Sequence, residues 1–199
     1  MTEQVTSWDP WVYMCTYRFG RRPLILGEAP SPQAPTVSWF GDAKSTKNLA
    51  TIIFGSASET DRLKSSFEMR NVFETHPGTS RDGFSVFDSD GAAINLQQES
   101  DAGLFEDRVT FFLGLRVAAG LCRTKSYELA ISEDSRFVAS NGWIDWLPVS
   151  GRSDILGLYL IVPHPQSYDM RYKAEDLLKL SALFRAALQL PPLDLQFGF

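Results

Sequence analysis

Alternating apolar residues mark the clearest strand of the chain. In the segment 108–117 every second side chain is apolar and falls on one face of an extended chain, namely Val109, Phe111, Leu113, Leu115 and Val117. Because successive side chains of a strand point to opposite faces, this spacing predicts a strand. The segment 155–162 is apolar on both faces, which predicts a central strand or one that helices cover. A further strand is predicted at 126–132.

A β-hairpin is predicted just before the first of these strands. Two short apolar segments, GFSVF at 83–87 and AAINL at 92–96, flank the dipeptide Asp90-Gly91. Asp-Gly accepts the positive φ angles of a tight two-residue turn. The pattern therefore predicts that an antiparallel meander begins near Phe84.

Helical spacing occurs in three other segments. The stretches 44–54 and 59–73 place apolar residues on one side of a helix, and so does the C-terminal stretch 169–190. The last of these ends at Pro191-Pro192, because proline cannot continue a helix. The apolar positions that carry the pattern are Leu49, Ile52, Ile53, Leu63, Phe67, Phe73, Leu177, Leu180, Phe184, Ala187 and Leu188.

These elements together predict the α+β class, with a mostly antiparallel sheet packed against helices and a long C-terminal helix. A chain of 199 residues can bury a substantial core, and we expect one domain that covers 1–199. The segment 27–36 contains Pro30, Pro32 and Pro35, which disfavour regular structure. It predicts a long loop within that domain.

The composition is that of an ordinary packed protein, with 44% hydrophobic and 22% charged residues. The longest apolar runs are far shorter than the roughly 20 residues that cross a bilayer, and the N-terminus lacks the features of a secretory signal. Two cysteines, Cys15 and Cys122, are too few for a disulfide framework or a four-thiolate zinc site. We therefore expect a cytoplasmic protein with buried free thiols, although the sequence leaves a disulfide between the two open.

All of the net negative charge lies in one segment. Between 82 and 107 there are seven acidic residues and no Lys or Arg, whereas the rest of the chain has a net charge of +2. A solvated loop kept soluble by its charge and a surface that meets a basic partner both explain this segment. The charge argues against nucleic-acid binding, which requires a basic surface.

Catalytic and metal-binding motifs give little support to an enzyme. His76 and His164 each precede a proline, but no GxSxG, HExxH or phosphate-binding glycine loop accompanies them. The run FDSDG at 87–91 spaces its carboxylates like a calcium loop, yet Ala92 and Ile94 stand where oxygen ligands are required. We therefore expect no metal and no cofactor.

Two tryptophans, Trp143 and Trp146, occur in the stretch NGWIDWLP at 141–148. In an extended chain residues three apart point to opposite faces, so we expect one ring to face the core and the other to lie nearer the surface. Both rings buried in the core is the alternative. An exposed tryptophan would be a candidate binding hot spot.

The second half of the chain resembles a family of bacterial proteins. The motifs, in order, are DGFSVFDSDG at 82–91, FLGLRVAAGL at 112–121, SYELAIS at 126–132, GWIDWL at 142–147 and PQSYD at 165–169, before a C-terminal helix. This order resembles the immunity proteins that protect bacteria from their own polymorphic or type VI secreted toxins, in particular the immunity protein 52 family. The resemblance implies a non-enzymatic cytoplasmic antitoxin that binds and blocks a toxin, for example a nuclease.

Three functions follow as hypotheses. The first is an immunity protein that docks on a basic toxin surface, with no direct contact to nucleic acid or membrane. Its expected partner-binding residues are Asp88, Asp90, Glu99, Asp101, Glu106, Asp107, Trp143 and Trp146. The second is a small-ligand-binding protein or enzyme with a pocket near His164, Tyr168 and Asp169, with Arg116 as an anion contact. The third is an assembly component that self-associates through exposed aromatic side chains.

Overall fold

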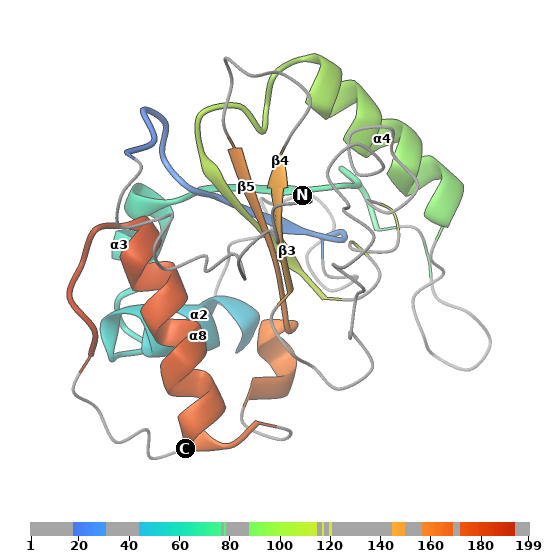
Figure 1. Ribbon diagram of the computed structural model, residues 1–199. Helices are drawn as coiled ribbons and strands as arrows, with labels where there is room; N and C mark the ends of the chain where they lie inside the picture. Colours follow the sequence, from blue (N-terminus) through green and yellow to red (C-terminus); the bar gives the residue numbers. More distant parts are fainter. Residues whose placement is uncertain are drawn as a thin grey trace, which may run out of the picture.

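The computed structural model describes residues 18–30, 44–76, 78, 88–114, 117, 120, 145–149, 157–168 and 172–193. Its strands are β1 (Leu24–Gly27), β2 (Glu68–Asn71), β3 (Val109–Leu113), β4 (Asp145–Val149) and β5 (Gly157–Val162). Its helices are α2 (Lys44–Phe54), α3 (Thr60–Ser66), α4 (Ser89–Asp101), the short 3-10 helix η2 (Pro165–Ser167) and α8 (Ala174–Ala187) (Figure 1). Several predictions concern residues outside these ranges, namely the strand at 126–132, most of the loop at 27–36, Cys15, Cys122, Arg116, Trp143 and Asp169.

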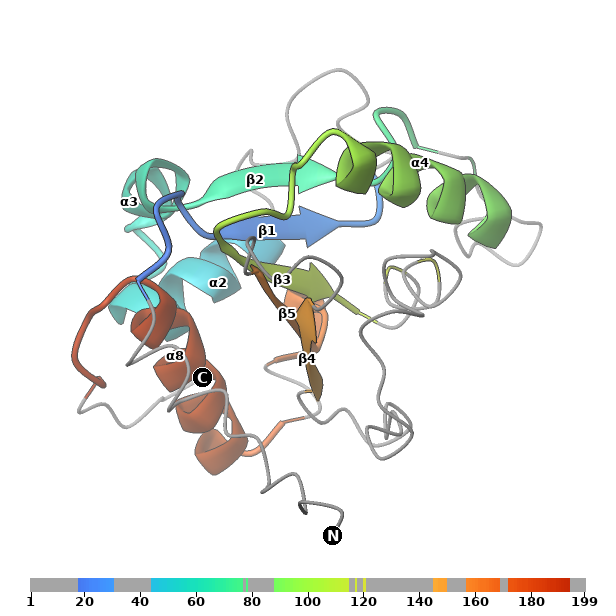
Figure 2. The same ribbon diagram turned by 45° about the horizontal axis from the view of Figure 1, so that its top comes forward.

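The prediction of a mostly antiparallel sheet was wrong. The strands form one five-stranded sheet in the order β2-β1-β3-β5-β4, and Figure 2 shows them side by side in this order. β2, β1, β3 and β5 are mutually parallel, and only the edge strand β4 runs antiparallel to its neighbour. Every residue of β1 and β3 is buried. Burial on both faces is typical of parallel strands covered by helices, so the arrangement is of the α/β type.

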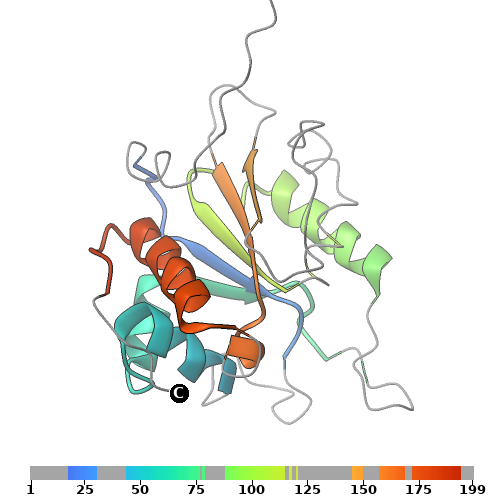
Figure 3. The same cartoon turned by 60° about the horizontal axis from the view of Figure 1, so that its bottom comes forward.

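The helices lie on two faces of the sheet because the chain reverses direction in it. After β1 the chain moves outward to β2, and it then passes back across β1 to reach β3. Crossovers between parallel strands are right-handed, so helices that connect strands in opposite directions cover opposite faces. Figures 1 and 3 show α2, α3 and α8 on one face and α4 on the other.

Each face has its own hydrophobic core. Under α2, α3 and α8 the rings of Phe111 and Phe184 stack with centroids 4.2 Å apart, and Phe67 packs edge-on against both. Under α4 the strand residues Leu24, Leu26, Phe112 and Ile161 pack against helix residues Ala92 and Leu96. Alternate residues of β1, β3 and β5 therefore fill the two cores in turn.

The predicted hairpin around Asp90-Gly91 is a helix. The carboxylate of Asp88 accepts hydrogen bonds from the backbone N–H groups of Asp90 (3.1 Å) and Gly91 (3.0 Å), which makes it the N-cap of α4. Ala92 and Leu96, four residues apart, are the buried side of this helix. Asp-Gly therefore begins a helix here and does not turn a hairpin.

Other element predictions were confirmed in part. The helix at 44–54 is α2, and the C-terminal helix is α8, shorter than the predicted 169–190. The stretch 59–73 divides into α3 and β2, with Phe67 extended between them. The strand predicted at 108–117 ends at Leu113, because Gly114 has a φ of 89° and turns the chain.

Candidate functional site

The carboxyl ends of the four parallel strands lie at one edge of the sheet. The strands end at Gly27, Asn71, Leu113 and Val162, and the register places Gly27 opposite Asn71 and Leu113 opposite Val162. The strand order reverses between β1 and β3. In open α/β sheets ligands bind outside the carboxyl ends of the strands at such a reversal. The carboxyl edge is therefore the first place to look for a site.

Asn71, the last residue of β2, has an unsatisfied acceptor at this edge. Its Oδ1 atom is buried and accepts no hydrogen bond from the described part of the chain. Met69, two residues earlier, packs against the core under α2, so alternation places Asn71 on the same face. A buried acceptor without a donor costs about 1–3 kcal/mol. A ligand that donates a hydrogen bond to this oxygen would remove that cost.

His164 lies at the same edge, two residues after β5. Its Nδ1 atom accepts a hydrogen bond from the backbone N–H of Gln166 (3.3 Å), as the N-cap of η2. A neutral imidazole with Nδ1 as acceptor carries its proton on Nε2. Burial lowers the pKa of His164 from 6.5 to about 4, because the charged ring would lose its hydration. At neutral pH the side chain is therefore an uncharged N–H donor.

The end of β3 packs against His164. The backbone N–H of Gly114 donates to the carbonyl of Val162 (2.8 Å), which continues the sheet by one residue. A Cβ atom at Gly114 would lie 3.4 Å from the Cβ of His164. Glycine is favoured here by the positive φ, and the added Cβ of a larger residue would come into van der Waals contact with the side chain of His164.

Asn71 ends β2 and His164 follows β5, and these two strands are three positions apart in the sheet. Neighbouring strands are about 4.8 Å apart, so the strand ends are separated by roughly 14 Å before the side chains reach inward. Between the two strands lies the end of β1 at Gly27, which has no side chain and is followed in the sequence by Glu28. One ligand of nucleoside size is therefore long enough to contact both ends of this row.

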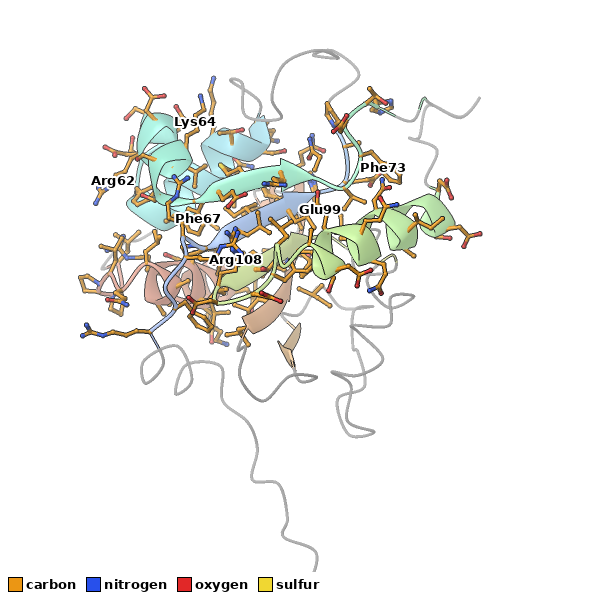
Figure 4. All side chains as sticks on the ribbon, turned by 90° about the horizontal axis from the view of Figure 1, so that it is seen from above. Arg62, Lys64, Phe67, Phe73, Glu99 and Arg108 are labelled. Carbon is orange, nitrogen blue, oxygen red and sulfur yellow. The ribbon has the colours of Figure 1, made fainter. Side chains whose placement is uncertain are left out.

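A network of ion pairs occupies the opposite, amino edge on the α4 face. The buried Arg108 donates to Glu68 (2.6 Å), Arg70 donates to the other oxygen of Glu68 (2.8 Å), and Arg70 lies 3.5 Å from Glu99; Figure 4 labels Arg108 and Glu99. Burial raises the pKa of Glu68, but the hydrogen bond and charge of Arg108, with Arg70, hold it below its ordinary value. Burial lowers the pKa of Arg108, and Glu68 opposes that shift. The network joins β2, β3 and α4.

The predicted partner-binding acids lie along α4 and the turn that follows it. Asp88 and Asp90 are at the start of α4, Glu99 and Asp101 at its end, and the other two acids, Glu106 and Asp107, come just before β3. A helix of 13 residues is about 20 Å long, so the acids form two groups. The second group lies beside arginines: Glu99 faces Arg70, and Arg21 donates to the Glu106 carbonyl at 3.4 Å.

The predicted tryptophan anchors are only partly located. Trp146 belongs to β4 and pairs with Leu160 of β5, so its backbone is at the antiparallel edge of the sheet. Of the alternative pocket predicted from the sequence, His164 and Tyr168 lie together at the carboxyl edge, with Tyr168 fully buried.

The other candidate sites among the described residues give weaker support for ligand binding. A hollow at the amino edge is lined by Phe19, Arg21, Pro23, Val109, Ala186, Ala187 and Gln189. It is remote from Asn71 and His164. Among the described residues no cluster of His, Cys, Asp and Glu side chains could hold a metal ion, and no helix has the length and apolar character to cross a membrane.

No protein-family model matches the chain, and a comparison with curated proteins finds no match. The site therefore has to be interpreted from its own chemistry. Sequence reasoning missed Asn71, because it assigned 59–73 to a helix. A polar residue that ends a strand in a parallel sheet is a recognisable signal only once the strand direction is known.

Proposed function

We propose that the carboxyl edge of the sheet binds a nucleobase-bearing ligand. The observation that carries this proposal is the buried, unsatisfied Oδ1 of Asn71 at the strand-order reversal. A carboxamide offers an acceptor and a donor side by side, which matches the N–H and C=O of a lactam nucleobase in two parallel hydrogen bonds. The position is also where doubly wound sheets bind nucleotides.

The chemistry that fits this ligand is hydrolysis of the N-glycosidic bond. When that bond breaks, the base keeps the bonding electrons and its carbonyl oxygen gains negative charge. An uncharged N–H donor stabilises such an oxygen without first giving up a proton, and His164 has this form at neutral pH. Water supplies hydroxide to the sugar carbon and one proton to the departing base.

Glu28 is the carboxylate that we assign to the water. It follows Gly27 directly, and its backbone carbonyl accepts a hydrogen bond from Phe73 (3.0 Å), which ties the ends of β1 and β2 together. A carboxylate beside the sugar takes the proton of the attacking water and balances the positive charge that develops on the ring. Asn71, His164 and Glu28 thus have separate roles: recognition, stabilisation of the leaving base and activation of water.

The test compares bases with and without the lactam edge. Purified protein is titrated with uracil, hypoxanthine, cytosine and adenine, and the release of free base is measured from nucleosides and from single-stranded oligonucleotides. We expect uracil and hypoxanthine to bind more tightly, and Asn71→Ala to weaken their binding at least tenfold. The matched control is Asn95→Ala, because Asn95 donates to the neighbouring Val72 carbonyl at 3.0 Å. Equal binding of all four bases, or no effect of Asn71→Ala, contradicts the proposal.

The two substrate forms distinguish the source of the base. Release from nucleosides alone indicates a free metabolite, whereas release from oligonucleotides alone indicates a base turned out of a strand. Binding without release leaves recognition in place and removes the hydrolytic role.

A second candidate function rests on α4. Ile94 is 58% exposed on this helix, and the partner-binding acids predicted from the sequence lie at both ends of it. An exposed apolar side chain with charged residues around it is typical of a protein–protein contact. On this basis we keep the cytoplasmic immunity protein as the second proposal. Charge reversal at Glu99 and Asp101 should weaken a complex with a toxin encoded beside the gene. Reversal of Glu175 and Asp176 on α8 is the control.

A further inference from the structure

The backbone that carries His164 is held by side chains on both sides of it. The amide of Asn48 in α2 donates to the carbonyl of Pro165 at 2.8 Å. The hydroxyl of Tyr168 donates to the carbonyl of Pro163 at 3.2 Å. The two hydrogen bonds therefore fix the residues that immediately precede and follow the histidine.

Both donors belong to packed parts of the fold. Tyr168 is fully buried, and its ring meets that of Tyr172 edge-on with centroids 6.3 Å apart. Burial raises the pKa of Tyr168 well above 10, so the hydroxyl keeps its proton and remains a donor. Asn48 lies in the middle of α2, between the buried residues Thr46 and Leu49. Figure 3 shows η2 beside α2.

The orientation of the imidazole depends on this backbone. The Nδ1 atom of His164 accepts from the N–H of Gln166, two residues along the chain, at 3.3 Å. That hydrogen bond requires the backbone of Pro163 to Gln166 to change from extended to helical at the start of η2. Tilting the backbone would move the Gln166 N–H away and allow the proton to occupy Nδ1.

We infer that Tyr168 and Asn48 are positioning residues for His164: by holding the carbonyls of Pro163 and Pro165, they keep Nδ1 an acceptor and Nε2 the protonated nitrogen that would donate to the ligand. The ligand in this statement rests on the proposed function, whereas the orientation of the ring does not. Neither residue needs to touch the ligand.

The first test is the tautomer of His164 in the wild-type protein. Long-range ¹H–¹⁵N spectra at pH 7 distinguish a protonated ring nitrogen from an acceptor nitrogen. We expect the Nε2–H tautomer. Detection of the Nδ1–H tautomer as the main form overturns the inference without any variant.

The second test removes each donor separately. Tyr168→Phe deletes only the hydroxyl, and Asn48→Ala deletes only the amide from a helical position that accepts alanine well. We expect both variants to show a mixture of tautomers and to bind uracil at least threefold more weakly. The controls are Tyr172→Phe and Thr51→Ala; Thr51 donates to the Lys47 carbonyl at 2.9 Å within α2.

The outcomes separate positioning from stability and from function. A tautomer that stays Nε2–H in both variants, while only the melting temperature falls, overturns the inference and leaves a merely structural role. A changed tautomer in a protein that binds no base supports the positioning of His164 and refutes the proposed function. A normal tautomer with impaired base binding contradicts the inference and supports the function.

Discussion

At the scale of single residues, burial decides which chemical groups are available at the carboxyl edge. His164 is neutral because its charged form would lose hydration, and Asn71 has an acceptor because no described donor reaches it. Neither property is visible in residue type alone. The low pKa of His164 predicts a dependence of stability on pH, and the unsatisfied oxygen of Asn71 predicts a loss of binding when Asn71 is replaced.

The first residue-scale prediction concerns pH. The pKa of His164 is about 4 in the folded chain and 6.5 in the unfolded chain. Between these values the unfolded state binds more protons, so stability is complete above pH 6.5 and falls as the pH drops towards 4, by up to about 3 kcal/mol. Urea unfolding at several pH values checks this.

His164→Asn is the matched variant for that measurement. Asparagine can still cap η2 through its side-chain oxygen, but it does not titrate. We expect the stability of the variant to vary less between pH 6.5 and 4 than that of the wild type. Parallel stability curves for the two proteins would contradict the assigned pKa.

The second residue-scale prediction concerns Gly114. Gly114→Ala should cost about 1–2 kcal/mol because its φ is 89°, and the new Cβ would touch the side chain of His164 at van der Waals distance. Gly78→Ala is the control, since Gly78 has a φ of 99° with nothing within 4 Å of the added atom. Only Gly114→Ala should shift the NMR signals of His164. Equal costs and an unchanged histidine signal would refute the close packing.

At the scale of elements, the helices are held by hydrogen bonds at their ends. α2 has no basic residue in its last turn, and Arg185 of α8 supplies one by donating to the carbonyl of Ile53 at 2.6 Å. The same guanidinium binds the carbonyl of Pro191, beyond the end of α8. Arg185 is only 8% exposed and its hydrogen bond to Ile53 is buried, so the carbonyl of Ile53 depends on it in place of water.

Arg185→Met should therefore lower the free energy of unfolding by about 1–3 kcal/mol, since it leaves the buried carbonyl of Ile53 without this donor. Arg62→Met is the comparison: Arg62 is 54% exposed and lies over the ring of Phe54 at 4.6 Å. That change should cost less than about 1 kcal/mol. Equal losses in urea unfolding would show that the Arg185 contacts contribute little.

The N-cap of α4 gives a second element-scale prediction. Asp88→Ala should cost about 1 kcal/mol, whereas Asp88→Asn should retain most of the stability because asparagine also caps helices well. The same pair tests the partner-binding role predicted for Asp88. If only the charge matters for a partner, Asp88→Asn weakens the complex without weakening α4.

At the scale of the whole molecule, α4 is joined to the sheet by charge as well as by apolar packing. Arg108, 2% exposed, is paired with Glu68, which connects through Arg70 to Glu99 on α4. Glu68→Gln should cost about 3 kcal/mol, because it leaves the buried arginine without its counter-charge. Glu68→Leu combined with Arg108→Met should recover part of this loss. A double variant less stable than Glu68→Gln would contradict the account.

The sequence predicted those elements whose pattern is local. α2, β3, β5 and α8 were found because apolar spacing and flanking proline or glycine depend only on neighbouring residues. β2, with the sequence EMRN, was missed because its α4-facing side is filled by Glu68 and Arg70, whose ion pairs make a polar strand stable in the sheet. The α4 helix was missed because Asp-Gly favours a hairpin turn as well as a helix start.

The site was predictable only in part for the same reason. His164 and Tyr168 were identified together as an alternative pocket, since they are close in sequence, and the structure places both at the carboxyl edge. Asn71 and Asn48 join them from strands and helices that are about 90 or more residues away. No spacing rule connects positions so far apart.

By itself, then, the sequence determined where α2, β3, β5 and α8 form, because backbone propensity and apolar period act within a few residues. The tertiary structure decided the direction of the strands, the order β2-β1-β3-β5-β4 and the placement of Asn71 and His164 at the same edge of the sheet. Those outcomes depend on which distant segments exclude water from each other, and the free energy of that burial belongs to pairs of elements and not to any single stretch of the chain.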